Sequence, residues 1–175
     1  MHRKENVTDV LLKPFAIRQS ELFSEKTLIW KREKLKTLGL ISCTKKKQSH
    51  PCKASEMYSL SDLFSKTFAY CSKNYDQVVI LSAKYGLLFP DDMVEPYDLT
   101  LKKMSSAEVK DWAEMVFKQM QKRLNLDDVS TVFFHAGSRY REKLIPKLQA
   151  LGINCKAPLG NLGIGKQLKW YNTHL

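Results

Sequence analysis

The sequence lacks the features that define several large protein classes. No apolar run approaches the ~20 residues that a membrane-spanning helix needs, and no internal repeat or low-complexity tract is present. The first segment, MHRKENVTDVLLKPF, is basic but contains neither the apolar core nor the small-residue cleavage site of a signal peptide. We therefore expect a cytoplasmic protein that does not use a membrane as its partner.

Cysteine and histidine are also sparse, with four of each. The cysteines Cys43, Cys52, Cys71 and Cys155 form no CxxC pair, and the histidines show no HExxH spacing. These spacings fit no zinc-site pattern, and reduced thiols are expected in the cytoplasm. The sequence therefore predicts no metal site and no cofactor.

Acidic residues are outnumbered by basic ones. The chain has 29 Lys and Arg against 18 Asp and Glu, which gives a formal net charge of +11 and a pI near 9.5. This excess favours a polyanionic partner such as nucleic acid. Because Lys greatly outnumbers Arg, we expect contact with the phosphate backbone rather than bidentate reading of guanine edges. The alternative is a basic soluble protein without such a partner.

Short apolar runs rich in β-branched residues predict the strands of a mostly parallel sheet. Three of them have the composition of strands buried on both faces, namely residues 38–41, 78–81 and 130–135. Residues 153–155 are expected to add a short edge strand. With helices between them, these strands predict one three-layer α/β/α domain at residues 36–175, with a sheet of four or five strands.

Helical spacing of apolar residues predicts a helix over residues 58–75, which Ser59 or Ser61 could cap, and a longer helix that begins at Ser105 and extends to about residue 124. A third helix is expected over residues 141–151, although it must accommodate Pro146. A short C-terminal helix should follow the glycine-rich segment at residues 158–166. Residues 1–35 are expected to form an N-terminal helical arm.

The stretch from Val78 to Leu101, VVILSAKYGLLFPDDMVEPYDLTL, begins as a strand and then becomes irregular. Gly86 permits a turn, and Pro90 and Pro96 argue against a helix. We expect a long polar loop at the carboxyl end of the strand, which is where ligands bind in open α/β sheets. The alternative is a surface loop with ordinary turn chemistry.

Polar residues follow the other two predicted central strands as well. The segment Ser42–Lys47 (SCTKKK) could hold an anion through backbone N–H groups and ammonium charge, although it lacks the glycines of a Walker A loop. His135, at the end of its strand, precedes Ala136-Gly137-Ser138-Arg139-Tyr140. It could instead be a buried histidine with satisfied hydrogen bonds. The glycine-rich tail could approach a phosphate closely.

Several segments occur in the order found in a family of small bacterial and phage domains of unassigned function. They are ISCTKKK, the helix start from Tyr58 to Phe64, LSAKYGLLFPDDMVEPYDLTL, HAGSRY and LGIGKQLKWY. The chain resembles this family over about residues 38–172. The family is distantly similar to the YaaA peroxide-stress proteins, whose central segment also reads Tyr-Gly-(Val/Leu)-Leu, Pro, Asp and then Pro-Tyr. The wider group is similar to the uracil-DNA-glycosylase-like α/β proteins.

This resemblance implies a protein directed to nucleic acid, with DNA expected, or to a nucleotide, which recognises or cleaves a base–sugar bond. The chain has no Gly-Gln-Asp-Pro-Tyr motif after its first strand and no His-Pro-Ser-Pro loop, which argues against uracil specificity. The implied activity is that of an N-glycosidase acting on a modified or damaged base or nucleotide.

Hydrolysis of an N-glycosidic bond needs a carboxylate near the sugar, a donor for the leaving base, and an aromatic or apolar slot for a flipped base. The candidate catalytic residues, carboxylates first and donors second, are Asp98, Glu95, Lys84 and His135. The candidate residues for binding substrate or phosphate, stacking tyrosines first, are Tyr85, Tyr97, Ser42, Cys43, Thr44, Lys45, Lys46, Ser138, Arg139, Gly163 and Lys166.

Two other functions fit the same residues. A non-catalytic nucleic-acid-binding protein would use the same lysines, with Asp98 and Glu95 as caps or salt-bridge partners. A small-nucleotide-binding regulator or interaction module is the third possibility. Steep salt dependence of DNA affinity would indicate phosphate contact, and release of free base would separate an enzyme from a binder.

Overall fold

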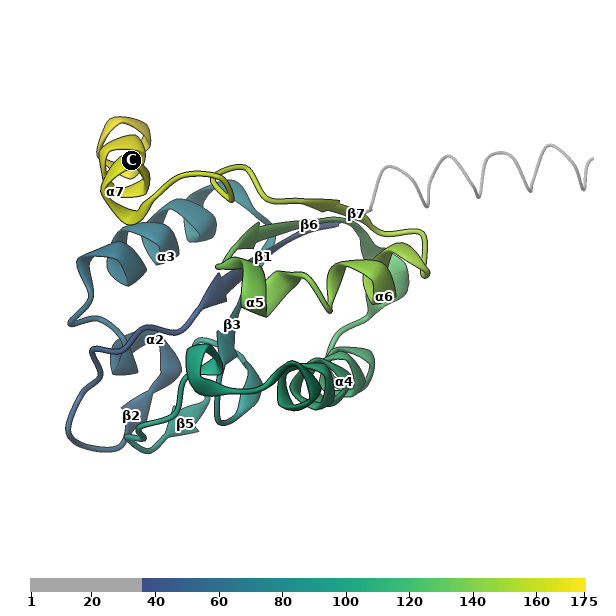
Figure 1. Ribbon diagram of the computed structural model, residues 1–175. Helices are drawn as coiled ribbons and strands as arrows, with labels where there is room; N and C mark the ends of the chain where they lie inside the picture. Colours follow the sequence, from purple (N-terminus) through teal and green to yellow (C-terminus); the bar gives the residue numbers. More distant parts are fainter. Residues whose placement is uncertain (1–35) are drawn as a thin grey trace, which may run out of the picture. The chain divides into compact units, whose positions relative to one another are not determined.

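The structure is a computed structural model, and it describes residues 36–175 (Figure 1). The expected N-terminal arm lies outside the described residues. Within the described part, no helix has the length and apolar character required to cross a membrane.

A five-stranded sheet forms the centre of the domain, in the order β4-β3-β1-β6-β7. All neighbouring pairs are parallel except β3 and β4. The strands are β1 (Lys36–Ser42), β3 (Gln77–Ser82), β4 (Gly86–Leu88), β6 (Val129–His135) and β7 (Asn154–Lys156). The expected mixed α/β fold with a mostly parallel sheet is confirmed.

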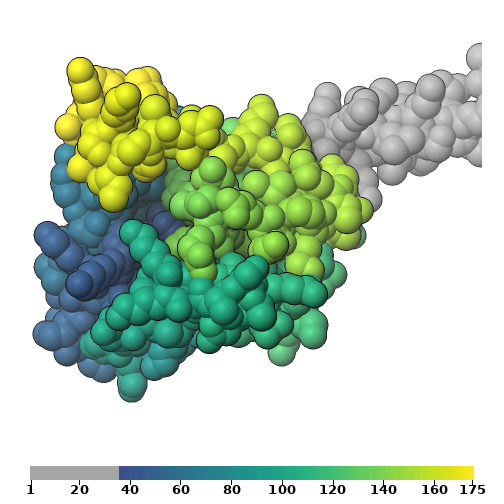
Figure 2. Space-filling view, viewed as in Figure 1, coloured from purple at the N-terminus to yellow at the C-terminus, as the bar shows by residue number. Residues whose placement is uncertain are grey.

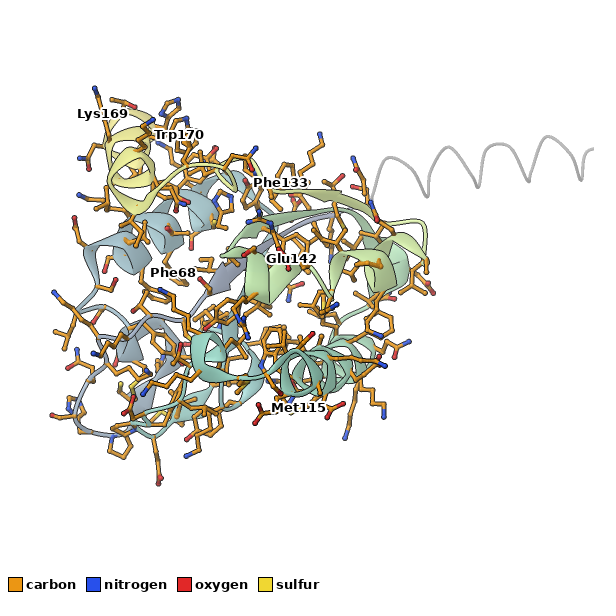
Figure 3. The ribbon with its side chains drawn as sticks, in the orientation of Figure 1. Phe68, Met115, Phe133, Glu142, Lys169 and Trp170 are labelled. Carbon is orange, nitrogen blue, oxygen red and sulfur yellow. The ribbon has the colours of Figure 1, made fainter. Side chains whose placement is uncertain are left out.

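Helices cover both faces of this sheet (Figure 1). On one face α3 (Asp62–Asn74) packs against β1 and β3, and α7 (Ile164–His174) packs against α3. On the other face lie α4 (Ser106–Arg123) and the short helices α5 (Ser138–Arg141) and α6 (Ile145–Gln149). Figure 3 shows Trp170 of α7 and Met115 of α4 on opposite sides of the sheet.

Small elements occupy the connections. Four residues of α2 (Ala54–Met57) precede α3, and a two-stranded antiparallel sheet joins β2 (Cys52–Lys53) to β5 (Met93–Val94). Single 3-10 turns, η1 (Leu101–Lys103) and η2 (Leu126–Asp128), lie on either side of α4.

The cap residues expected from the sequence are present. The Ser61 hydroxyl accepts from the Phe64 N–H at the start of α3. At α4, the Ser105 hydroxyl accepts from the Glu108 N–H, and the Glu108 carboxylate accepts from the Ser105 N–H. The predicted apolar stripe of α4 is buried, which confirms that it belongs to the core.

Two expectations about local structure are wrong. Residues 141–151 do not form one helix, because Pro146 occupies the first turn of a separate helix, α6, where its missing N–H does no harm. Gly86–Leu88 is not irregular, since these residues pair with Ile80–Ser82 as the edge strand β4. The tight connection is possible because Gly86 has a φ of 76°.

Side chains of α4 bond the backbone of this edge. The Gln119 side chain accepts from the Leu87 N–H at 2.7 Å and donates to the Tyr85 carbonyl at 3.1 Å. Arg123 donates to the Leu87 carbonyl at 3.0 Å and forms an ion pair with Asp92. The segment that leads away from β3 is therefore fixed to α4.

Replacing Gly86 with alanine should destabilise the domain severely. Alanine would have to adopt the positive φ of Gly86. Its Cβ would overlap the Gln119 side-chain oxygen and would lie 2.9 Å from Met115 Cε. We expect a loss of about 2 kcal/mol or more in the free energy of unfolding, measured by urea denaturation. Gly165→Ala is the control, because a Cβ there meets no atom within 4 Å in helix α7. An equally mild effect of both substitutions would contradict this account.

Candidate functional site

The sheet opens at the end where β1, β3 and β6 finish, which we call the carboxyl edge. The chain leaves β1 toward α3 on one face and leaves β6 toward α5 on the other. Pairing of β1 with β6 ends at Ile41 and His135, whereas the Cys43 N–H still donates to the Leu81 carbonyl of β3 at 2.9 Å. The two strands therefore part at the topological switch point, where open α/β sheets bind ligands.

A hollow lies at this point in the space-filling view (Figure 2). The end of β1 is visible at its base, between the green segment that contains α5 and the blue segment that contains α3. We call this hollow the switch-point crevice; it lies where Ser42–Cys43 leave β1 and Ala136–Gly137 leave β6. The Cys43 thiol and the Tyr140 hydroxyl lie 3.2 Å apart and so join the loop after β1 to α5.

A hydroxyl cluster of Tyr58, Ser82 and Tyr97 lies beside the crevice. The Tyr97 hydroxyl is 2.8 Å from Ser82 Oγ and 3.0 Å from the Tyr58 hydroxyl. Burial raises the pKa of Tyr58 to about 12 and raises the pKa of Tyr97 further. Both phenols are therefore neutral at physiological pH and act as hydrogen-bonding groups.

Ser82 also organises the turn after β3. Its hydroxyl accepts from the N–H groups of Lys84 and Tyr85, at 3.3 and 3.1 Å. Its carbonyl accepts from the indole N–H of Trp112 at 2.9 Å. The buried Ser82 and the α4 core therefore fix the backbone of the turn that carries Lys84.

Two ammonium groups converge on the ring of Tyr97. Lys47 Nζ lies 4.3 Å from the ring centroid, and Lys84 Nζ lies 6.0 Å from the same centroid and 4.9 Å from that of Tyr85. Within residues 36–175 neither lysine forms an ion pair with a carboxylate. In the same part of the chain, no carbonyl accepts from the backbone N–H groups of residues 44–47.

The expected stacking role of Tyr85 and Tyr97 does not fit this arrangement. Their rings meet edge to face, with centroids 5.5 Å apart, and the lysine ammonium groups lie over them. The Tyr97 hydroxyl points into the buried cluster, so its ring forms the floor beneath two cations. A base would have to displace an ammonium group to stack there.

The two candidate carboxylates flank Tyr97 in the chain. Asp98 and Glu95 are exposed, and neither forms an ion pair with another described residue. The Glu95 carbonyl accepts from the Tyr85 hydroxyl at 3.3 Å, which holds this part of the loop against the lysine-bearing turn. Both carboxylates therefore remain accessible at the carboxyl edge.

His135 is separated from these groups by its own hydrogen bonds. Its side chain is buried between Tyr75, whose hydroxyl lies 2.8 Å from Nε2, and Tyr171, whose hydroxyl lies 2.6 Å from Nδ1. Burial lowers the pKa of His135 to about 4. With both ring nitrogens occupied on the α3–α7 side of the sheet, the histidine fits the alternative of a satisfied core residue rather than a donor to substrate.

Arg139 also has a structural contact that the sequence did not suggest. Its guanidinium donates to the carbonyls of Leu101, at 2.8 Å, and Met104. It therefore anchors η1, and with it the exposed Lys102 and Lys103, to α5. The expected phosphate contact of Arg139 does not fit this pairing.

The remaining predicted binding residues are distributed around the carboxyl edge. Lys45 and Lys46 are exposed and Thr44 is half-buried, with its hydroxyl 3.3 Å from the Lys46 carbonyl. Gly163 and Lys166 lie at the exposed beginning of α7. Sequence reasoning missed Tyr58 and Tyr140 as site residues, and it included Lys47 only as part of the segment Ser42–Lys47. Tyr140 could have been noticed, because it ends the HAGSRY motif that follows β6.

No metal centre is indicated by residues 36–175, where no three His, Cys, Asp or Glu side chains are grouped to hold an ion.

The burial of His135 predicts a pH dependence of stability. Because its folded pKa of about 4 lies below the ordinary value of 6.5, the unfolded chain binds the proton more readily. The contribution of His135 is complete above about pH 6.5 and falls by up to about 3 kcal/mol as the pH drops to about 4. His135→Gln, which retains a donor and an acceptor, should remove this pH-dependent contribution to the free energy of unfolding, as measured by urea denaturation. Identical pH profiles of the two proteins between about pH 6.5 and 4 would contradict this.

Comparison with known proteins gives a family but no activity. Residues 38–173 match the model of the Family of unknown function (DUF6884). The uncharacterized protein YfjM of Bacillus subtilis (strain 168) is 32% identical over 117 residues, which cover 63% of this chain and 75% of YfjM. No solved structure matches. The chain therefore belongs to the DUF6884 family.

Proposed function

We propose that the protein binds nucleic acid, with DNA as the expected form, through backbone phosphates at the carboxyl edge. The observation that carries this proposal is the convergence of Lys47 and Lys84 on the Tyr97 ring without a carboxylate partner among the described residues. Two like charges over one ring repel each other, and an anion between them would remove that cost.

The surroundings of the two lysines suit a phosphate. The N–H groups of residues 44–47, which have no carbonyl acceptor in the described chain, could donate to phosphate oxygens. Lys45, Lys46, Lys102 and Lys103 add exposed charge on neighbouring loops. The net charge of +11 favours a partner that carries many negative charges.

Neutralising Lys47 or Lys84 should weaken binding to single-stranded DNA and lower its salt dependence. Each of Lys47→Gln and Lys84→Gln should reduce the slope of log affinity against log salt by about 1, as expected for one lost phosphate contact. Fluorescence anisotropy at several salt concentrations measures the slope. Lys122→Gln is the charge-matched control, because Lys122 lies in the last turn of α4, at the opposite end of the sheet. A wild-type affinity independent of salt would exclude phosphate-led binding and favour a small-nucleotide regulator.

Hydrolysis of an N-glycosidic bond is the second candidate function. It is favoured by the accessible carboxylates of Asp98 and Glu95 beside the proposed phosphate contact, and by the resemblance to glycosylase-like α/β proteins. In this reaction Asp98 would stabilise positive charge at the sugar C1′ or orient a water, and Lys84 would donate to the leaving base. His135 takes no part, because both of its ring nitrogens are bonded to tyrosines.

Asp98→Asn tests the hydrolytic role. Asp98 is exposed and forms no ion pair with a described residue, so the variant should fold normally, as circular dichroism and urea denaturation would show. Release of free base from strands carrying modified bases should fall by about 10²-fold or more, which is the usual contribution of one general acid or base. Unchanged release would exclude Asp98, and the same measurement on Glu95→Gln would then test the other carboxylate.

A further inference from the structure

We infer that the switch-point crevice binds the sugar and base of one unpaired nucleotide, while Lys47 and Lys84 hold its phosphate. This inference rests on the proposed phosphate binding and adds the class of substrate: a nucleotide outside a duplex, either within a single strand or free. The chain leads from the crevice to the lysine pair, because Ser42 ends β1 and Lys47 lies in the loop that follows it.

The separation of β1 and β6 provides the space. The ladder between them stops at Ile41 and His135, while β1 continues to pair with β3 through Ser42 and Cys43. Ser42–Cys43 and Ala136–Gly137 therefore leave the sheet next to each other and then diverge. The surface is hollowed at this position (Figure 2), so the opening is a feature of the sheet topology.

The segments that leave the sheet at the crevice carry the neutral polar side chains of Ser42, Cys43, Ser138 and Tyr140. The Cys43 thiol and the Tyr140 hydroxyl lie 3.2 Å apart, and burial raises the pKa of Tyr140 so that its phenol stays neutral. Half-buried Phe68 lies on the side of α3 that faces the end of β1 (Figure 3). Neutral donors and acceptors beside an aromatic ring suit a sugar and a heterocyclic base, whereas the phosphate belongs with the lysines.

Gly137, just after the end of β6, is a position where a side chain can be introduced beside the crevice. Its φ of −62° and ψ of 162° are available to any residue, and a Cβ built there meets no atom of the chain within 4 Å. By contrast, a Cβ on Gly39 would lie 2.7 Å from the Tyr75 ring, and one on Gly160 would lie 3.0 Å from the Arg141 guanidinium. Gly39 is closed to a side chain, whereas Gly137, like Gly163 and Gly165, borders open space and can accept one.

An unpaired nucleotide follows from the shape of the site. A base in a duplex is stacked on both faces, so an enzyme or receptor reaches its edges in a pocket only when the nucleotide is extruded or the strand is single. Within residues 36–175, the carboxyl-edge lysines Lys47, Lys84, Lys102 and Lys103 come from loops and a 3-10 turn rather than from a long helix that could enter a major groove.

The experiment compares two single strands whose flanking positions are all abasic. One strand carries an ordinary base at its central position, and the other carries an abasic tetrahydrofuran there. The wild-type full-length protein should bind the strand with the base about tenfold more tightly than the fully abasic strand. Gly137→Phe fills the crevice and should abolish this difference while leaving affinity for the fully abasic strand within twofold. Gln121→Phe adds the same ring to the exposed last turn of α4 and is the control.

The outcomes separate this inference from the proposed function. Equal wild-type affinity for both strands, or a Gly137→Phe variant that keeps the difference, would overturn the crevice as the nucleotide site, while salt-dependent binding of the abasic strand would keep phosphate binding intact. No binding of either strand would overturn both unless a free nucleoside 5′-monophosphate binds. Binding of that nucleotide, lost in Gly137→Phe and stronger than binding of inorganic phosphate, would identify the free nucleotide as the ligand.

Discussion

Burying the Tyr97 hydroxyl costs free energy unless it is hydrogen-bonded, and the bonds that satisfy it join three separate parts of the chain. Ser82 ends β3, Tyr58 precedes α3, and Tyr97 comes from the loop before η1. Ser82 also accepts hydrogen bonds from the N–H groups of Lys84 and Tyr85 and from the Trp112 indole. A single neutral cluster therefore fixes the loop positions at the carboxyl edge. The cations above it are placed by groups that carry no charge of their own.

This arrangement explains why the edge is suited to an anion. A structural site would pair its lysines with carboxylates, as the exposed Lys53 does with Asp91. At the Tyr97 ring the positive charges are supported by an aromatic face, whose attraction to an ammonium ion is modest, on the order of 1 kcal/mol at exposed sites. The two ammonium groups therefore form no ion pair with a described carboxylate and remain available to an incoming ligand.

Sequence patterns identified the buried strands, the caps at Ser61 and Ser105, and the edge of the sheet where polar groups gather. These follow from local composition and from the direction in which parallel strands end. The strand β4 was not predictable, because three apolar residues after a turn have no distinctive period and depend on Gln119 and Arg123 for their outer bonds. The divergent positions of His135 and Tyr97 were also hidden, because strand sequence does not show which face a terminal side chain will occupy.

The contacts of Gln119 with β4 have a consequence for assembly. Its amide group makes the bonds that another strand would make, so a second chain cannot extend the sheet at that end by pairing with Leu87. The opposite end is the three-residue β7, which has only β6 as a strand neighbour in the described part of the chain. Extension of the central sheet by a second molecule is therefore confined to the short edge strand β7. This strand carries Lys156, whose charge discourages pairing with another strand.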